Sequence, residues 1–271
     1  MFYENLLDQM LKEEKNPVNS MYLNELKIKW NNFYKIVNEE PGNNEVMVKA
    51  LNSFIKTTSN RKYQFRVVTN KGFKRDSHIY FADYLNDMIS VIMKRKKIMK
   101  NKGISWGYQP FSYKFKFNPV NLFDLAEKPN YNVADSVNIL QLVQKMDFQY
   151  RISGKRNFEK FKISIPLIQF YIYKNLVEEN LVNAEYYSYL AKKTYGISKS
   201  IIVCETIDPD FQLNLASSTV DVVYVLRKQC ADSEVEDISL DTVNALEEKI
   251  DQYLQEEKTT LSEMIERGII E

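Results

Sequence analysis

The sequence predicts an α+β fold that is rich in helix and contains short mixed or antiparallel sheet segments. Apolar residues recur at helical spacing over long stretches, most clearly from Tyr80 to Ile92. Shorter stretches alternate between apolar and polar residues, as a half-buried strand does, and the clearest is 111–117. Helical patterns outnumber alternating ones, so we expect a compact, soluble protein with more helices than strands.

Apolar stripes and capping residues predict the helices in chain order. A first helix should begin at the N-cap Ser20 and stop at Pro41-Gly42, and a shorter helix should follow around 47–55. The stripe from Tyr80 should end with Gly103 in the C′ position. Further helices are predicted at 135–146, from Pro166 to about residue 179, from Asn183 to Gly196, along the stripe 243–253, and after a capping box at 260–263.

Alternating or apolar runs predict the strands. They are expected at 63–68, 113–117, 200–206 and 219–226, with a hairpin at 147–166 that turns through 153–156. The stretch 125–135 is the best candidate for a domain boundary, which predicts one region at 1–128 and another at 129–271. No apolar run approaches the roughly 20 residues that span a bilayer, and the N-terminus lacks the pattern of a secretory signal.

Charge is distributed very unevenly along the chain, although the net charge is only +1. Residues 49–120 contain 16 basic residues against 3 acidic ones, and residues 229–271 contain 3 basic residues against 13 acidic ones. A basic middle and an acidic tail can mark contact with nucleic acid, or faces that meet in an assembly.

The densest basic stretch, which we call the basic segment, is residues 94–102. Its cations are Lys94, Arg95, Lys96, Lys97, Lys100 and Lys102, and the excess continues upstream at Lys71, Lys74 and Arg75. Cations near a helix C-terminus complement the helix dipole, so a solvated helix end is one interpretation. Six like charges within nine positions also repel one another and call for a counter-charge. Phosphates could supply it, and so could the acidic tail of this chain or of a neighbour.

Residue types exclude several classes of enzyme. His78 is the single histidine, which excludes sites built from paired histidines, and no nucleotide-binding or nucleophile-elbow motif occurs. We therefore expect no cofactor. The two cysteines, Cys204 and Cys230, fit a reducing compartment.

Four acidic residues lie at the end of one predicted strand, in the loop that follows and at the start of the next predicted strand: Glu205, Asp208, Asp210 and Asp221. Carboxylates beside adjacent strands can hold Mg²⁺, and this group is loosely similar to the acidic half of the PD-(D/E)xK nucleases. The sequence departs from that pattern because no (D/E)xK follows on the next strand, where Asp221-Val222-Val223 stands. The alternative is a polar loop of turn-forming acids, in which case Asp210→Ala and Asp221→Ala should leave stability and activity largely unchanged.

Three functions remain open from the sequence. The first is a nucleic-acid-binding protein that uses the basic segment, and the second is a structural subunit, for example of a virus particle, whose basic middle contacts a neighbour's acidic tail as a homo-oligomer. The third is a metal-dependent nuclease. Partners would be nucleic acid or other protein subunits, with no membrane, in the cytoplasm or a virion. The 29 lysines against 8 arginines suggest an AT-rich genome, such as that of a prokaryote or its phage.

Overall fold

The computed structural model describes residues 2–58, 61–63, 66–68, 74–76, 83–117, 131–151, 158–229 and 236–267. Its helices are α1 (Phe2–Glu13), α2 (Pro17–Glu39), α3 (Asn44–Thr58), η1 (Arg61–Tyr63), α4 (Asp83–Arg95), η3 (Lys97–Lys100), α6 (Glu178–Thr194) and α7 (Leu240–Arg267). Its strands are β1 (Arg66–Val68), β2 (Lys74–Asp76), β3 (Ile104–Phe117), β4 (Tyr131–Arg151), β5 (Phe158–Leu176), β6 (Lys199–Ile207) and β7 (Val222–Val225). The expected α+β class is confirmed.

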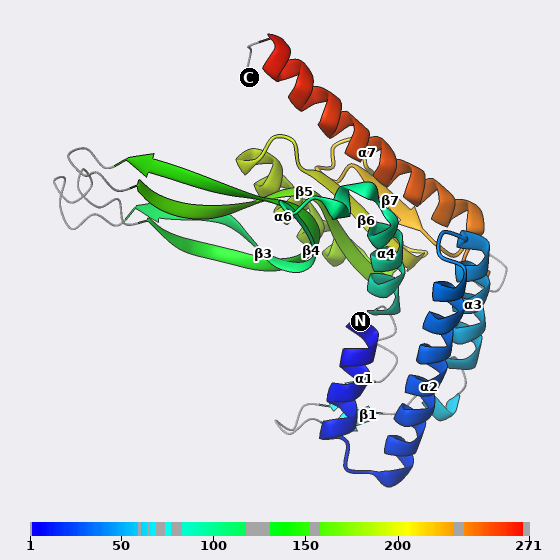
Figure 1. The fold of residues 1–271 in the computed structure, drawn as a ribbon. Helices are drawn as coiled ribbons and strands as arrows, with labels where there is room; N and C mark the ends of the chain where they lie inside the picture. The colour runs from blue at the N-terminus through cyan, green and yellow to red at the C-terminus, as the bar shows by residue number, and fades with distance from the viewer. Residues whose placement is uncertain are drawn as a thin grey trace.

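A mixed five-stranded sheet in the order β3-β4-β5-β6-β7 forms the centre of the molecule (Figure 1). The pairs β3–β4 and β4–β5 are antiparallel, whereas β5–β6 and β6–β7 are parallel. Helix α6 provides the crossover between the parallel strands β5 and β6, as such a connection requires. The strands β3 and β4, which lie on either side of the boundary expected at residue 128, are neighbours in this sheet.

Each face of the sheet carries its own hydrophobic core. On one face, Leu140, Phe170 and Val203 pack with buried residues of α1–α4 and α7. On the other face, Ile139 and Ile202 pack with buried residues of α6. Side chains that alternate along a strand therefore enter opposite cores, so the central strands are buried on both faces.

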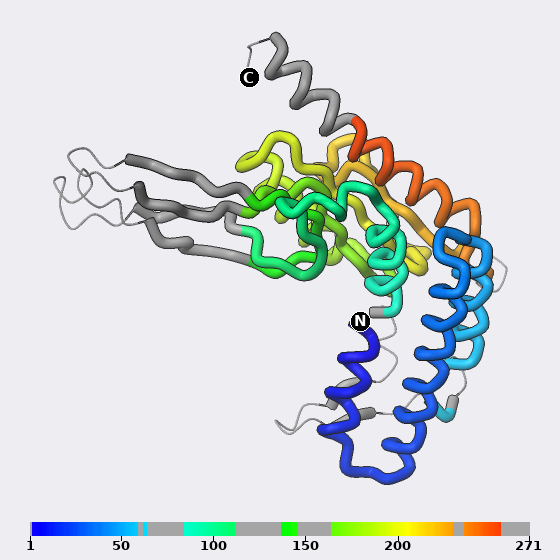
Figure 2. Tube along the Cα trace, viewed as in Figure 1, coloured from blue at the N-terminus to red at the C-terminus, as the bar shows by residue number. Residues whose placement is uncertain are grey.

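The three N-terminal helices pack together at one end of the molecule, and the start of α7 runs beside α3 (Figure 2). The buried carboxylate of Asp87 on α4 accepts hydrogen bonds from the backbone N–H groups of Phe2 and Tyr3, at 2.9 and 3.0 Å. These N–H groups have no partner within their own helix, so Asp87 caps α1 and ties it to α4.

Two predicted helices are wrong. Residues 135–146 lie in β4, and residues 166–176 lie in β5, which is 19 residues long. Pro166 sits opposite Val143 at an irregularity in the register of β4 and β5, where a missing N–H is tolerated. The hairpin predicted at 147–166 is confirmed in its strands, and its turn at 153–156 lies outside the described residues.

Several predicted helix ends are also corrected. The first long helix begins at Pro17, because the side chain of Asn16 caps it by accepting from the N–H of Val18. Helix α6 begins at Glu178 rather than at Asn183. Helix α7 continues through the expected capping box at 260–263 as one helix of 28 residues. The helix with the basic segment stops at Arg95, eight residues before Gly103.

Candidate nucleic-acid interface

The basic segment forms the junction between α4 and β3. Helix α4 ends at Arg95, the short 3-10 helix η3 follows at Lys97–Lys100, and a turn at 101–103 leads into β3. The side chain of Asn101 closes this turn by accepting a hydrogen bond from the N–H of Gly103 at 2.9 Å. The N–H of Lys145 on β4 donates to the carbonyl of Gly103 at 2.6 Å. The segment is therefore attached to the sheet at its C-terminal end.

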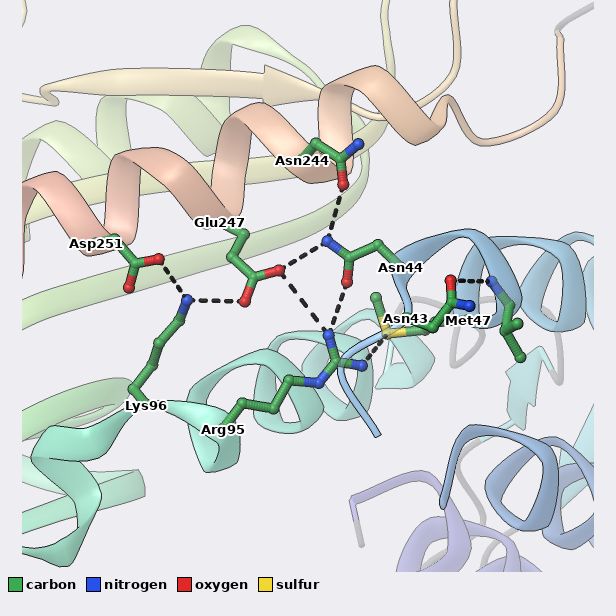
Figure 3. A network of polar contacts seen from close by, with 9 residues as sticks. Asn43, Asn44, Met47, Arg95, Lys96, Asn244, Glu247 and Asp251 are labelled. Atoms are coloured by element: carbon green, nitrogen blue, oxygen red, sulfur yellow. Dashed lines mark hydrogen bonds and ion pairs between the residues drawn. The ribbon is translucent and has the colours of Figure 1, made fainter. Parts of the chain in front are cut away.

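Two cations of the basic segment are paired inside the chain (Figure 3). Lys96 Nζ lies 2.7 Å from Glu247 Oε1 and 2.7 Å from Asp251 Oδ2, both on α7. Arg95 Nη1 donates to the side-chain oxygen of Asn44 on α3 at 2.7 Å and lies 3.9 Å from Glu247 Oε2. The acidic tail thus supplies part of the counter-charge that we expect for the basic segment.

Glu247 is the centre of this network, which we call the α4–α7 lock. Its Oε2 also accepts a hydrogen bond from Asn44 Nδ2 at 2.7 Å. Burial alone would raise the pKa of Glu247, but hydrogen bonds from Lys96 and Asn44 and the charges of Lys96 and Arg95 together hold it below 4.5. Glu247 is therefore ionised at neutral pH, and the lock fixes the N-terminal part of the basic segment against α3 and α7.

The other four cations, Lys94, Lys97, Lys100 and Lys102, are exposed. None of them forms an ion pair with a side chain that the structure describes, which leaves out those of residues 61, 66–68, 74–76, 83, 112–117, 131–136, 146–151, 158–163 and 256–267. Residues three apart eclipse each other in a 3-10 helix, so Lys97 and Lys100 lie on the same side of η3. Between them, Ile98 and Met99 pack against the core. We call the four exposed lysines, Lys94, Lys97, Lys100 and Lys102, the lysine corner.

The upstream candidates are only partly placed. Lys74 and Arg75 lie in β2, which pairs with β1 in a separate two-stranded sheet. Lys71 lies outside the described residues, as does His78. The expectation that these three basic residues extend the contact surface stays a prediction.

The four acidic candidates lie apart. Asp208 and Asp210 occupy the turn after β6, where Asp208 Oδ1 accepts from the N–H of Asp210 at 3.0 Å. Asp221 stands beside Ser200, at the start of β6 and β7. Because these strands are parallel, Asp208 and Asp221 are at opposite ends, roughly 25 Å apart along the strand. Among the described residues, no group of three or more metal-ligating side chains is found.

Glu205 is buried and paired with a cation. Its side chain is 4% exposed, and its Oε1 lies 2.7 Å from Arg227 Nη1. The hydroxyl of Tyr84 lies close by, and burial together with the charge of Glu205 raises the pKa of Tyr84 well above 10.0. Glu205 therefore forms an ion pair with Arg227 in the interior, at the end of β6.

Asp221 and Asp210 should differ in their effect on stability. Asp221 Oδ2 accepts from the N–H of Ser200 at 2.7 Å and lies 2.8 Å from Lys192 Nζ. We expect Asp221→Ala to lower the free energy of unfolding by about 1–2 kcal/mol because both contacts are lost. Asp210→Ala removes an exposed side chain and should change it by less than about 0.5 kcal/mol. Urea denaturation measures both, and equal effects would contradict the structure. The expectation that both substitutions are neutral is thus revised for Asp221.

A row of buried polar side chains crosses the sheet and was not predicted. Gln141 on β4 stands directly opposite Gln169 on β5, which stands opposite Ser200 on β6. Gln169 Nε2 donates to Gln141 Oε1 at 3.2 Å, and Tyr171 Oη donates to Gln169 Oε1 at 3.1 Å. The amides are uncharged and bonded to each other, so the row serves to fix the register of the strands. The sequence contains one sign of this row, since a single glutamine stands within each of the apolar runs 139–143 and 167–171.

Comparison with known proteins identifies a similar fold. Neither the protein-family models nor the curated proteins give a match. Among solved structures, a chain of the native BbvCI A2B2 tetramer superposes with a TM-score of 0.59 at 15% sequence identity, over 93% of this chain and 94% of that chain. The likeness covers nearly the full length of both chains, so the helices at the end of the sheet are part of the shared fold. No described helix is long and apolar enough to cross a membrane.

Proposed function

We propose that this protein contacts DNA through the lysine corner. The proposal rests on a division within the basic segment, in which some cations form ion pairs within the chain and others are exposed. Arg95 and Lys96 are held by carboxylates of α7, whereas Lys94, Lys97, Lys100 and Lys102 project to solvent without a carboxylate partner among the described residues. Lysines that project from a fixed backbone can contact phosphates without the cost of ordering the backbone.

The fold supports DNA as the polyanion. BbvCI is a restriction endonuclease, and the likeness in fold covers nearly the whole length of its chain. The lysine corner carries no group that reads base edges in a fixed geometry, since lysine binds phosphate as a point charge. The contact we propose is therefore with the backbone of the duplex, and it positions the protein without specifying a sequence.

The alternative of a structural subunit depended on a basic middle that meets the acidic tail of a neighbour. In the structure, two of the basic residues meet the acidic helix of their own chain instead. The nuclease alternative depended on carboxylates that the structure does not bring together. Contact with DNA needs only the exposed lysines, and we therefore place it first.

Replacing the four lysines with glutamine tests the proposal. The variant Lys94→Gln/Lys97→Gln/Lys100→Gln/Lys102→Gln should bind a duplex of about 30 base pairs at least about 1,000-fold more weakly near 100 mM salt, whatever its sequence, because each lost phosphate contact removes nearly one decade of affinity. Fluorescence anisotropy with labelled DNA measures this effect. Adding Mg²⁺ to the same mixtures and following the integrity of the DNA tests the nuclease alternative.

A matched control separates the lysine corner from net charge. The variant Lys12→Gln/Lys15→Gln/Lys35→Gln/Lys228→Gln also removes four exposed lysines, but from other parts of the surface. It should bind within about threefold of the parent, since long-range attraction is largely screened beyond a Debye length of about 10 Å. Equal losses of DNA affinity in the two variants would show that the lysine corner contributes only through the net charge of the protein, and this result would overturn the proposal.

A further inference from the structure

Helix α6 exposes a narrow apolar stripe on the side that faces away from the sheet. Leu181, Ala184, Ser188 and Ala191 are buried against β5 and β6. On the outer side, Val182, Tyr186 and Tyr189 are 58%, 53% and 48% exposed. They follow one another at steps of four and three residues, so they lie on one line along the helix. Large side chains that are each about half exposed and form a line are typical of a contact surface.

Charged residues of opposite sign stand at the two ends of this stripe. Glu178 lies one further step of four residues toward the N-terminus, and Lys193 lies one step of four toward the C-terminus. Both are exposed, and Lys193 Nζ lies 5.5 Å from the centre of the Tyr189 ring. Glu178 also shares the border of a surface groove with Asp208 and Asp210, which adds negative charge at the N-terminal end. The stripe therefore runs from an acidic end, across an apolar middle, to a basic end.

This order of residues is complementary to itself when the helix is reversed. In an antiparallel pair centred between residues 185 and 186, Glu178 faces Lys193 and Val182 faces Tyr189. The two copies of Tyr186 then lie next to each other beside the centre. A two-fold axis produces this pairing, because each contact of a symmetric interface occurs twice. The charged pair and the apolar pair share one midpoint, so the stripe is complementary to a second copy of itself.

We propose that α6 is the interface of a homodimer, in which it packs antiparallel against α6 of a second copy about a two-fold axis that passes between residues 185 and 186. The helix has 17 residues and is about 25 Å long, so one helix pair buries less surface than a standard interface. The dimer is accordingly weak, with a dissociation constant on the order of 10–100 µM. The proposal is independent of DNA contact, because the lysine corner and α6 use different residues.

Sedimentation equilibrium over 1–200 µM tests the interface. The parent should show a reversible monomer–dimer equilibrium, and Tyr186→Glu should remain monomeric because it places two like charges next to each other beside the axis. Ile28→Glu is the matched control, since Ile28 is an exposed apolar residue on α2 and its substitution adds the same charge. A parent that stays monomeric at 200 µM, or an Ile28→Glu variant that loses the dimer while Tyr186→Glu keeps it, would overturn the proposal.

Charge reversal tests the direction of the pairing. Glu178→Lys and Lys193→Glu alone should each weaken the dimer at least threefold, and the double variant should regain most of the loss. Within one copy the two residues are over 20 Å apart along the helix, so recovery reports a contact between copies. In a Cys230→Ser background, Tyr186→Cys should form a disulfide-linked dimer on mild oxidation, whereas Ile28→Cys should not. Recovery that fails while Tyr186→Cys remains uncrosslinked would exclude the antiparallel pair.

Discussion

Arg227→Leu is expected to lower the free energy of unfolding by about 3–5 kcal/mol, the largest effect on stability that we predict for one residue. Glu205 lies in the interior beside Tyr84, and the guanidinium of Arg227 is its partner at 2.7 Å. Removing the cation leaves a carboxylate in the core without the charge that balances it. Arg227 also donates through Nε to the carbonyl of Glu236 at 2.6 Å, and this hydrogen bond is lost as well.

A double variant distinguishes the effect of the unpaired charge from the effect of lost side-chain packing. Glu205→Leu/Arg227→Leu removes both charges and should be more stable than Arg227→Leu alone by at least about 1 kcal/mol, because no buried charge is left unpaired. Chemical denaturation of the parent, the two single variants and the double variant completes the cycle. An Arg227→Leu variant within about 1 kcal/mol of the parent would show that the carboxylate finds another partner or water.

Glu247→Gln is expected to lower the free energy of unfolding by about 2–3 kcal/mol by opening the α4–α7 lock. The side chains of Lys96 and Glu247 are 9% and 19% exposed, so solvent replaces little of the lost interaction. Lys96 keeps Asp251 at 2.7 Å, which limits the loss. The neighbouring Glu248→Gln removes the same charge from an exposed position of α7 and should change stability by less than about 0.5 kcal/mol.

The lock should also respond to pH. The pKa of Glu247 is lower in the folded protein than the 4.5 of a free side chain. Its ionisation therefore stabilises the protein fully above about pH 4.5, and the stabilisation is lost as the pH falls through the lower, folded pKa. The difference in stability between the parent and Glu247→Gln should be constant from pH 8 to pH 5 and shrink below that. A difference that grows on acidification would show that Glu247 is not the anion of the lock.

Two features of the fold could be predicted from the sequence because they depend on residues close together in the chain. The stripes at 23–37 and 243–253 occur where α2 and α7 form, since one face of each helix is buried. The segments 135–146 of β4 and 166–176 of β5 were predicted as helices, and the error has a physical reason. They are buried on both faces, and Gln141 and Gln169 interrupt their apolar runs, so the remaining apolar positions fall at i, i+1, i+3 and i+4, as in a helix.

The sequence predicts the excess of positive charge at the candidate site. It does not predict which cations form ion pairs within the chain and which are exposed. The sequence shows six cations in nine positions, and it shows an acidic tail that could balance them. Which cations the tail balances depends on a contact between Lys96 and Glu247, 151 residues apart, and on Asn44, which bridges Arg95 and Glu247. Such a contact depends on how α3, α4 and α7 pack, which no local pattern records. The same holds for Glu205, whose partner Arg227 lies 22 residues further along the chain.

The salt dependence of DNA binding tests the central claim most directly. We expect the logarithm of the association constant of the parent to fall linearly with the logarithm of the salt concentration between 50 and 300 mM. The variant with glutamine at residues 94, 97, 100 and 102 should show a slope that is shallower by about 3–4, because about 0.9 is lost for each phosphate contact. Equal slopes for the parent and this variant would contradict the account, since the lysine corner would then make no contact with phosphate.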